Sequence, residues 1–201
     1  MQLSKSTTAG ERDRRCSTVR YRANEEIYTQ GGKTDRLYRL REGAVRSARF
    51  NSEGRRQVGN FYYPGDVFGL ETEPEHQYGV EALTDCVVES ISSSSGSEDE
   101  IATLAEVTRQ QLRKVSEHLV LLGRKTAREK VALFLLSYAA RNPDADVELP
   151  MNRQDIADYL GLSVETVSRT LTLLQEESVV AFPAARRFRV TRWDVLQRMA
   201  T

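Results

Sequence analysis

The chain has 201 residues, enough for one large or two small domains that each bury a core of their own. Its 29 basic and 29 acidic residues cancel, so the overall charge does not point to a nucleic-acid partner. The longest apolar run, residues 131–136, is far shorter than the ~20 residues of a membrane helix, and the first residues lack the apolar core of a secretory signal. Cys16 and Cys86 have no CxxC spacing, which fits a reducing compartment, and we expect a cytoplasmic protein without a membrane partner.

Short strands are predicted in the first half of the chain. Polar and apolar residues alternate in residues 37–41 and again in residues 44–50. Glycine-containing turn signals separate such segments, at residues 30–32, 42–43, 52–54 and 63–66. This spacing is typical of a small β-roll or barrel, predicted here over residues 18–97. Residues 1–17 are expected to form a flexible arm, and the serine-rich residues 92–97 a linker or an exposed turn.

A helical period begins after the serine-rich segment. Apolar or small residues recur every three or four positions, at Ile101, Ala105, Thr108, Leu112, Val115, Leu119 and Leu122. Such a heptad stripe predicts a helix over residues 98–123 that pairs with a second copy as a coiled coil. A helix buried within one subunit is the alternative. Leu104, Val120 and Leu121 lie off the stripe and are expected to pack on their own subunit.

A second helix is predicted over residues 126–140. It is more apolar than the first, so it should be buried on several sides. Residues 141–144, Arg-Asn-Pro-Asp, are expected to end it, because proline cannot continue a helix.

Residues 151–176 carry the signals of two short helices joined by a tight turn. Asn152 is a good N-cap for the first helix, Gly161 supplies the turn, and Ser163 is a good N-cap for the second. The apolar residues expected between the two helices are Ile156, Ala157, Leu160, Val167, Leu171 and Leu174. Together these features predict a DNA-binding helix-turn-helix, for which a generic pair of packed helices is the alternative.

The second helix presents a polar face suited to reading bases in the major groove. Arg169 can donate two hydrogen bonds to guanine, and Glu165 can accept one from the amino group of cytosine or adenine. Val164 can contact a thymine methyl group, and Ser168 can reach a base edge or a phosphate. We therefore expect Val164, Glu165, Ser168 and Arg169 to be the base-reading residues.

The last quarter of the chain predicts a basic wing. Residues 179–182 and 187–190 read as two strands around a turn at 183–186. From residue 178 onward five arginines, Arg186, Arg187, Arg189, Arg192 and Arg198, accompany one acid, Asp194. This stripe suits phosphate binding, and an ordinary solvated surface is the alternative. The expected contacts to the DNA backbone are Asn152, Ser163, Thr166, Arg186 and Arg187.

Four segments resemble one known family in the same order along the chain. They are GAVR at 43–46, EGRRQVGNFYYPGDVFGLE at 53–71, EALTDCVV at 81–88 and ETVSR at 165–169. The chain thereby resembles the Crp/Fnr superfamily of bacterial regulators, and its FixK-type, Fnr-like branch in particular. The resemblance implies an α+β fold with a cyclic-nucleotide-binding-like β-roll, a dimerisation helix at 98–123 and a winged helix-turn-helix at 124–201.

The resemblance also implies a function. A homodimer would bind a palindrome with TTGA-type half-sites, read by Glu165, Ser168 and Arg169, and would activate transcription by recruiting RNA polymerase. The genes expected under its control are those of oxygen limitation, respiration or nitrogen fixation.

Two departures from the family bear on effectors. Glu71, Glu73 and Glu75 follow the position where cyclic-nucleotide-binding members carry an arginine, and they would repel a cyclic phosphate. An iron–sulfur cluster needs about four thiolates, which two isolated cysteines cannot supply. Cys86 is instead expected to be a buried strand residue. No cofactor or metal is therefore predicted.

The chain has two histidines, His76 and His118, which are too few for a metal centre or a confident haem ligand. His76 is expected in a surface loop, and His118 at a solvated or interface position beside the stripe. Two alternatives to effector-free DNA binding remain. One is gating by a ligand or haem in the β-roll. The other is a cupin-like metalloenzyme, which the scarcity of histidines and the helix-turn-helix disfavour, so we do not expect an enzyme.

Overall fold

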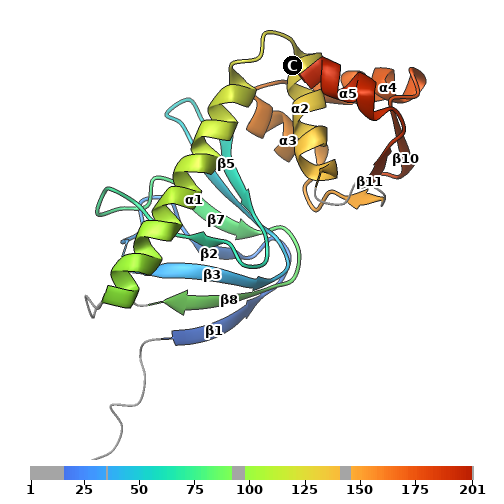
Figure 1. The fold of residues 1–201 in the computed structure, drawn as a ribbon. Coiled ribbons are helices and arrows are strands. Elements are labelled where there is room, and N and C mark those ends of the chain that lie inside the picture. Colours follow the sequence, from blue (N-terminus) through green and yellow to red (C-terminus); the bar gives the residue numbers. More distant parts are fainter. Residues whose placement is uncertain (1–15, 35, 92–97, 141–145, 201) are drawn as a thin grey trace, which may run out of the picture.

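The computed structural model describes residues 16–34, 36–91, 98–140 and 146–200 (Figure 1). Most of the predicted arm, the serine-rich linker at 92–97 and the stop signal at 141–144 lie outside the described residues. The chain forms an N-terminal β-roll, a long helix along it, and a smaller C-terminal domain of helices and short strands. The predicted α+β class is confirmed.

The β-roll consists of two antiparallel four-stranded sheets. Its strands are β1 (Cys16–Tyr21), β2 (Glu26–Tyr28), β3 (Leu37–Glu42), β4 (Val45–Phe50), β5 (Arg56–Tyr62), β6 (Val67–Phe68), β7 (Gly79–Ala82) and β8 (Cys86–Ile91). The sheet orders are β1-β8-β3-β6 and β2-β7-β4-β5. Apolar residues such as Leu40, Phe68 and Val80 fill the space between the sheets. Cys86 belongs to this core as predicted, and its burial raises the pKa of the thiol to about 11, which keeps it protonated.

Helix α1 (Glu98–Leu122) presents two different faces. On the face toward its own roll, Val107 and Leu121 are buried, and the Gln111 amide donates to the backbone oxygen of Val67 at 2.6 Å. Lys114 pairs on the same face with Asp66 at 2.7 Å. The other face exposes a row of aliphatic side chains, namely Ile101, Leu104, Leu112, Val115 and Leu119.

The two faces of α1 correct part of the sequence interpretation. Leu104 and Val120 do not pack on their own subunit, since 40% and 57% of their surfaces are exposed. Leu104 lies one turn before Thr108 on α1, and its exposed side chain joins the exposed row. Leu121 is buried as predicted. Leu122 is half-buried against the core of the C-terminal domain.

The C-terminal domain packs its helices around one apolar core. Its elements are α2 (Ala127–Ala139), β9 (Val147–Glu148), α3 (Arg153–Leu160), α4 (Val164–Glu176), β10 (Val180–Ala184), β11 (Arg187–Val190) and α5 (Trp193–Ala200). The strands form one antiparallel sheet in the order β10-β11-β9. Helix α2 is buried on several sides, as its apolar composition predicts. The sequence interpretation missed β9 and α5, whose short lengths give a weak periodic signal.

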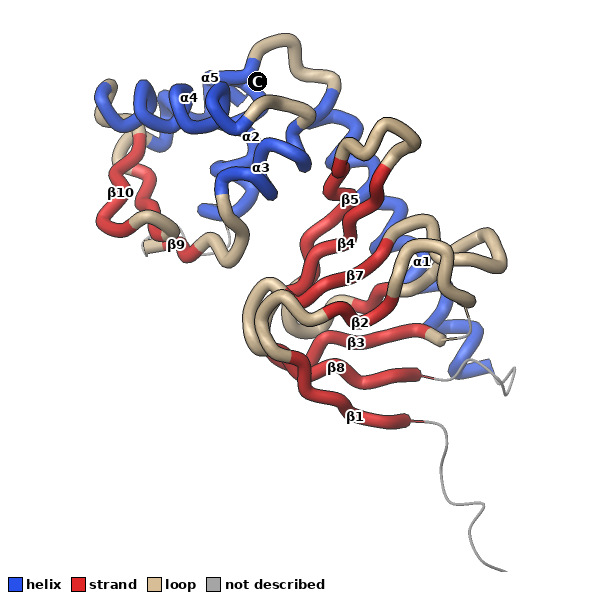
Figure 2. Tube along the Cα trace, turned by 180° about the vertical axis from the view of Figure 1, so that it is seen from behind, coloured by secondary structure: helices blue, strands red, loops and turns tan. Residues whose placement is uncertain are grey.

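The C-terminal domain lies against one end of the roll. Figure 2 shows α3 beside β4 and β5, the strands of the roll nearest to it. Among the described helices, none combines the length and apolar character needed to cross a lipid bilayer.

Candidate nucleic-acid interface

The predicted helix-turn-helix is formed by α3 and α4. Asn152 caps α3 through a reciprocal pair of hydrogen bonds: the backbone N–H of Asp155 donates to Asn152 Oδ1 at 2.8 Å, and that of Asn152 donates to Asp155 Oδ2 at 3.2 Å. Gly161 ends the helix with φ of 63°, a left-handed conformation that glycine adopts without steric cost. Ala157 is completely buried, as expected for a small residue where two helices cross closely.

Helix α4 begins at a capped N-terminus and has one buried and one exposed face. The Ser163 hydroxyl accepts a hydrogen bond from the backbone N–H of Thr166 at 3.2 Å. The apolar face is buried as predicted, through Val167, Leu171 and Leu174. Glu165, Ser168 and Arg169 are exposed on the other side. Val164 differs from the expectation, because it is half-buried against the core and presents only part of its side chain.

The side chain of Glu165 favours the ionised form, which accepts hydrogen bonds. Its own backbone N–H and the Ser163 hydroxyl bond to its carboxylate and lower its pKa, because both stabilise the charged form. An ionised carboxylate beside an arginine one turn away gives the exposed face both an acceptor and a donor.

The wing forms as β10 and β11, with Arg186 in the turn and Arg187 at the start of β11. Both side chains are exposed. Arg186 donates a long hydrogen bond of 3.4 Å to the backbone oxygen of Pro150. Two other arginines of the predicted basic stripe form ion pairs within the chain: Arg189 pairs with Asp146 at 2.6 Å, and Arg198 pairs with Asp194 at 2.8 Å. These two are therefore less available to phosphate than the sequence stripe suggested.

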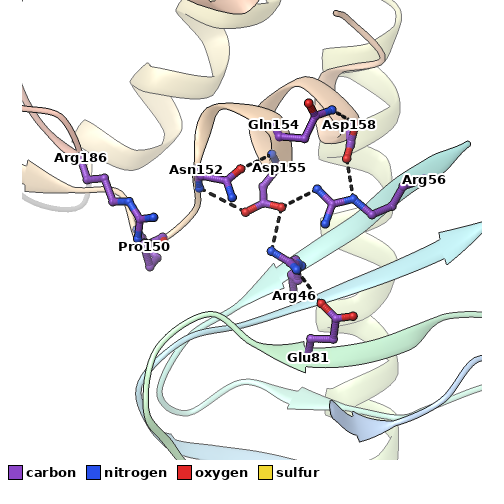
Figure 3. Close-up of polar contacts among 9 residues, drawn as sticks. All are labelled: Arg46, Arg56, Glu81, Pro150, Asn152, Gln154, Asp155, Asp158 and Arg186. Carbon is purple, nitrogen blue, oxygen red and sulfur yellow. Dashed lines mark hydrogen bonds and ion pairs between the residues drawn. The ribbon is translucent and has the colours of Figure 1, made fainter. Parts of the chain in front are cut away.

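A cluster of charged residues joins α3 to the roll (Figure 3). Arg46 of β4 donates to Asp155 Oδ1 at 2.8 Å and to Glu81 of β7 at 2.5 Å. Arg56 of β5 donates to the same Asp155 oxygen at 2.7 Å and to Asp158 at 2.6 Å. Asp155 is completely buried, so these two guanidinium groups offset the cost of removing its carboxylate from water. Sequence reasoning missed this cluster.

His118 also connects α1 to α3, a contact within the chain that the sequence did not predict. Its ring stacks on Tyr159 with the centroids 4.0 Å apart, and its Nε2 lies 2.8 Å from the Tyr159 carbonyl oxygen. Burial lowers the pKa of His118, which favours the neutral ring.

A cavity of about 370 Å³ lies between the roll and α1. Its lining includes Tyr62, Tyr78, Glu71 and Lys114, together with Val115 and Leu119 from the exposed row of α1. Lys114 is the one lysine or arginine among the described lining residues, and it already pairs with Asp66. A cavity that offers Glu71 and an engaged lysine does not fit the charge of a cyclic phosphate.

The three glutamates and the histidine of residues 71–76 differ in whether they reach this cavity. Glu71 lines the cavity, whereas Glu73 and Glu75 are exposed and lie outside its lining, so only one of the three glutamates acts there. His76 is buried, contrary to the prediction of a surface loop. Its ring stacks on Tyr28 with the centroids 3.8 Å apart, and its backbone bonds to Gly31 and Gly32 hold it inward. The described residues contain no group of three or more potential metal ligands.

Comparison with known proteins gives matches over both domains. Residues 18–96 match the family model of the cyclic nucleotide-binding domain, and residues 129–199 match that of the Crp-like helix-turn-helix domain. The nitrogen fixation regulation protein FixK of Azorhizobium caulinodans is 39% identical over 188 residues, which are 88% of this chain and 76% of that protein. FixK of Rhizobium meliloti is 37% identical over 180 residues, 89% of this chain and 85% of the relative.

The whole arrangement also matches a solved structure. The structure of FixK2 from Bradyrhizobium japonicum superimposes with a TM-score of 0.85 at 38% sequence identity. The match covers 92% of this chain and 98% of FixK2.

Proposed function

This chain belongs to the Crp/Fnr family of transcription regulators, and on that premise we propose that it binds palindromic DNA as a homodimer without a small-molecule effector. The observation that carries the proposal is the capped helix α4, whose exposed face offers Glu165, Ser168 and Arg169 to the major groove. The relatives named nitrogen fixation regulation protein FixK support a role in nitrogen fixation, and the relative named anaerobic regulatory protein supports a role under oxygen limitation. We propose that it activates transcription by recruiting RNA polymerase; the name of one relative, transcriptional activatory protein AadR, supports activation.

Base recognition would follow from the spacing on α4. Glu165 and Arg169 are four residues apart, so both project from the same strip of the helix. Arg169 would donate two hydrogen bonds to guanine, and Glu165 would accept one from an exocyclic amine, as in a TTGA-type half-site. The exposed part of Val164 would meet a thymine methyl group. Asn152, Ser163, Thr166, Arg186 and Arg187 would contact the backbone and fix the register.

The exposed row on α1 supports the homodimer. The exposed row of Ile101, Leu104, Leu112, Val115 and Leu119 faces solvent in one chain, and the exposed Thr108 lies beside it. The same row on a second copy would cover it, related by a two-fold axis. The two α4 helices of such a dimer would bind half-sites about 34 Å apart.

Introducing negative charges into the exposed row of α1 tests the proposed dimer. Replacing Val115 and Leu119 together by glutamate should yield monomers in sedimentation, because like charges would be buried at the seam. Val120→Glu is the matched control, since Val120 is equally exposed but lies off the row. An unchanged dimer in the double variant would place the interface elsewhere.

Effector independence rests on Glu71 in the cavity. Calorimetry with cyclic AMP should show no heat, and protein free of metal and nucleotide should protect one palindrome from a randomised library. Micromolar binding that sharpens the footprint would overturn this part of the proposal. It would favour gating by a ligand, for which a cavity of about 370 Å³ is large enough. An absorbance spectrum of the purified protein tests the haem form of that alternative.

A further inference from the structure

The buried carboxylate of Asp155 connects two functions of the molecule. Its Oδ2 accepts the backbone N–H of Asn152 and so completes the cap of α3. Its Oδ1 accepts hydrogen bonds from Arg46 and Arg56, which lie on neighbouring strands of the roll (Figure 3). The group that starts the first helix of the helix-turn-helix is therefore also the group that attaches this motif to the roll.

The strands that carry the two arginines also form a wall of the cavity. Ser47 and Gln57 line the cavity, and each follows directly after Arg46 or Arg56 in the sequence. Because successive side chains of a strand point to opposite faces, Arg46 and Arg56 are directed away from the cavity and toward α3. A single layer of sheet thus separates the cavity from the helix-turn-helix.

The geometry of these contacts restricts rotation of one domain against the other. Arg56 bridges two carboxylates on the same side of α3, through Nη2 to Asp155 and through Nε to Asp158. The planar guanidinium group fixes both distance and angle, whereas an apolar contact would permit sliding. On the roll side, Glu81 holds Arg46 in place.

We propose that Arg46, Arg56 and Asp155 form a positioning clamp that sets the spacing at which a dimer presents its two reading helices. The inference rests on the proposed function, since spacing has meaning only for a dimer that binds two half-sites. It explains how α4 is held in a fixed orientation in the absence of an effector. The clamp residues touch no DNA and act through the orientation of the domain that carries α4.

The test compares operators rather than a single affinity. Palindromes are prepared with the half-sites moved apart or together by one or two base pairs, and binding to each is measured for the wild type and for Arg46→Gln, Arg56→Gln and Arg56→Lys. Lysine keeps the positive charge but lacks the planar group that fixes the angle between the two carboxylates, so this variant remains informative if glutamine impairs folding. Arg49→Gln is the matched control, because Arg49 lies on β4 but bonds to Gln57 within the roll.

The wild type and Arg49→Gln should prefer one spacing strongly. The clamp variants should lose about tenfold of that preference, the factor that corresponds to one charge-assisted hydrogen bond. Thermal melting and sedimentation of the same samples check that fold and dimer persist. A clamp variant that binds every spacing less well by the same factor, or that binds as the wild type does, would overturn the clamp. A wild type that binds none of the palindromes would overturn the proposed function itself, and the clamp with it.

Discussion

Several polar side chains of α3 are bound by the rest of the chain, whereas the polar face of α4 that carries Ser168 and Arg169 faces solvent. In α3, Asp155 and Asp158 accept hydrogen bonds from the roll, and Tyr159 stacks on His118 of α1. In α4, Ser168 and Arg169 are exposed on the face opposite the core. Helix α3 therefore attaches this motif to the rest of the chain, and helix α4 is left available for an external partner. Changes in α3 should therefore affect stability, and changes in α4 recognition.

Asp155→Ala should have the largest effect. Two guanidinium groups would remain at the interface without their shared carboxylate, and we expect the free energy of unfolding to fall by about 3–5 kcal/mol. Urea denaturation measures this change. Asp194→Ala is the control, because Asp194 forms an exposed pair with Arg198 in α5 and should cost less than about 1 kcal/mol. Similar losses in the two variants would refute the attachment role of α3.

Arg169→Ala should leave stability unchanged and weaken DNA binding by about 1–3 kcal/mol, mainly at one base pair of each half-site. A panel of single-base operator variants measures the effect. Equal weakening on every variant would mean that Arg169 contacts the backbone and that α4 reads bases through other residues.

Arg187→Ala in the wing should weaken binding to all sequences alike. A phosphate contact carries no sequence information, so the slope of log affinity against log salt should decrease in magnitude by about one. Titrations at two salt concentrations test this, with Arg189→Ala as the comparison, since Arg189 is already paired with Asp146. If Arg187→Ala instead changes the base preference, Arg187 contacts bases rather than phosphates.

The smallest effect is expected from acidification at the contact between α1 and α3. Burial lowers the pKa of His118 in the folded protein, so the unfolded chain binds a proton more readily. The stability that the neutral ring contributes is therefore present above the ordinary histidine pKa and is lost as the pH falls below it. Urea denaturation at pH 7.5 and 5.5 should show a larger decrease for the wild type than for His118→Gln. Equal decreases would refute this contribution.

The same contrast explains which features could be predicted from the sequence. The caps at Asn152 and Ser163 and the turn at Gly161 are local signals, and the structure has each of them where the pattern indicates. The partners of Asp155 lie 109 and 99 residues away along the chain, so no spacing pattern links them. His76 likewise has polar and turn-forming neighbours in sequence, and only the folded roll brings Tyr28 against its ring.

The position of the cavity has a kinetic consequence. Val115 and Leu119 line it and also belong to the exposed row of α1 that a second copy would cover. In a dimer built on that row, a molecule in the cavity would exchange with solvent slowly, because one route of escape would be closed by the partner. Occupancy of the cavity would then change more slowly in the dimer than in a single chain.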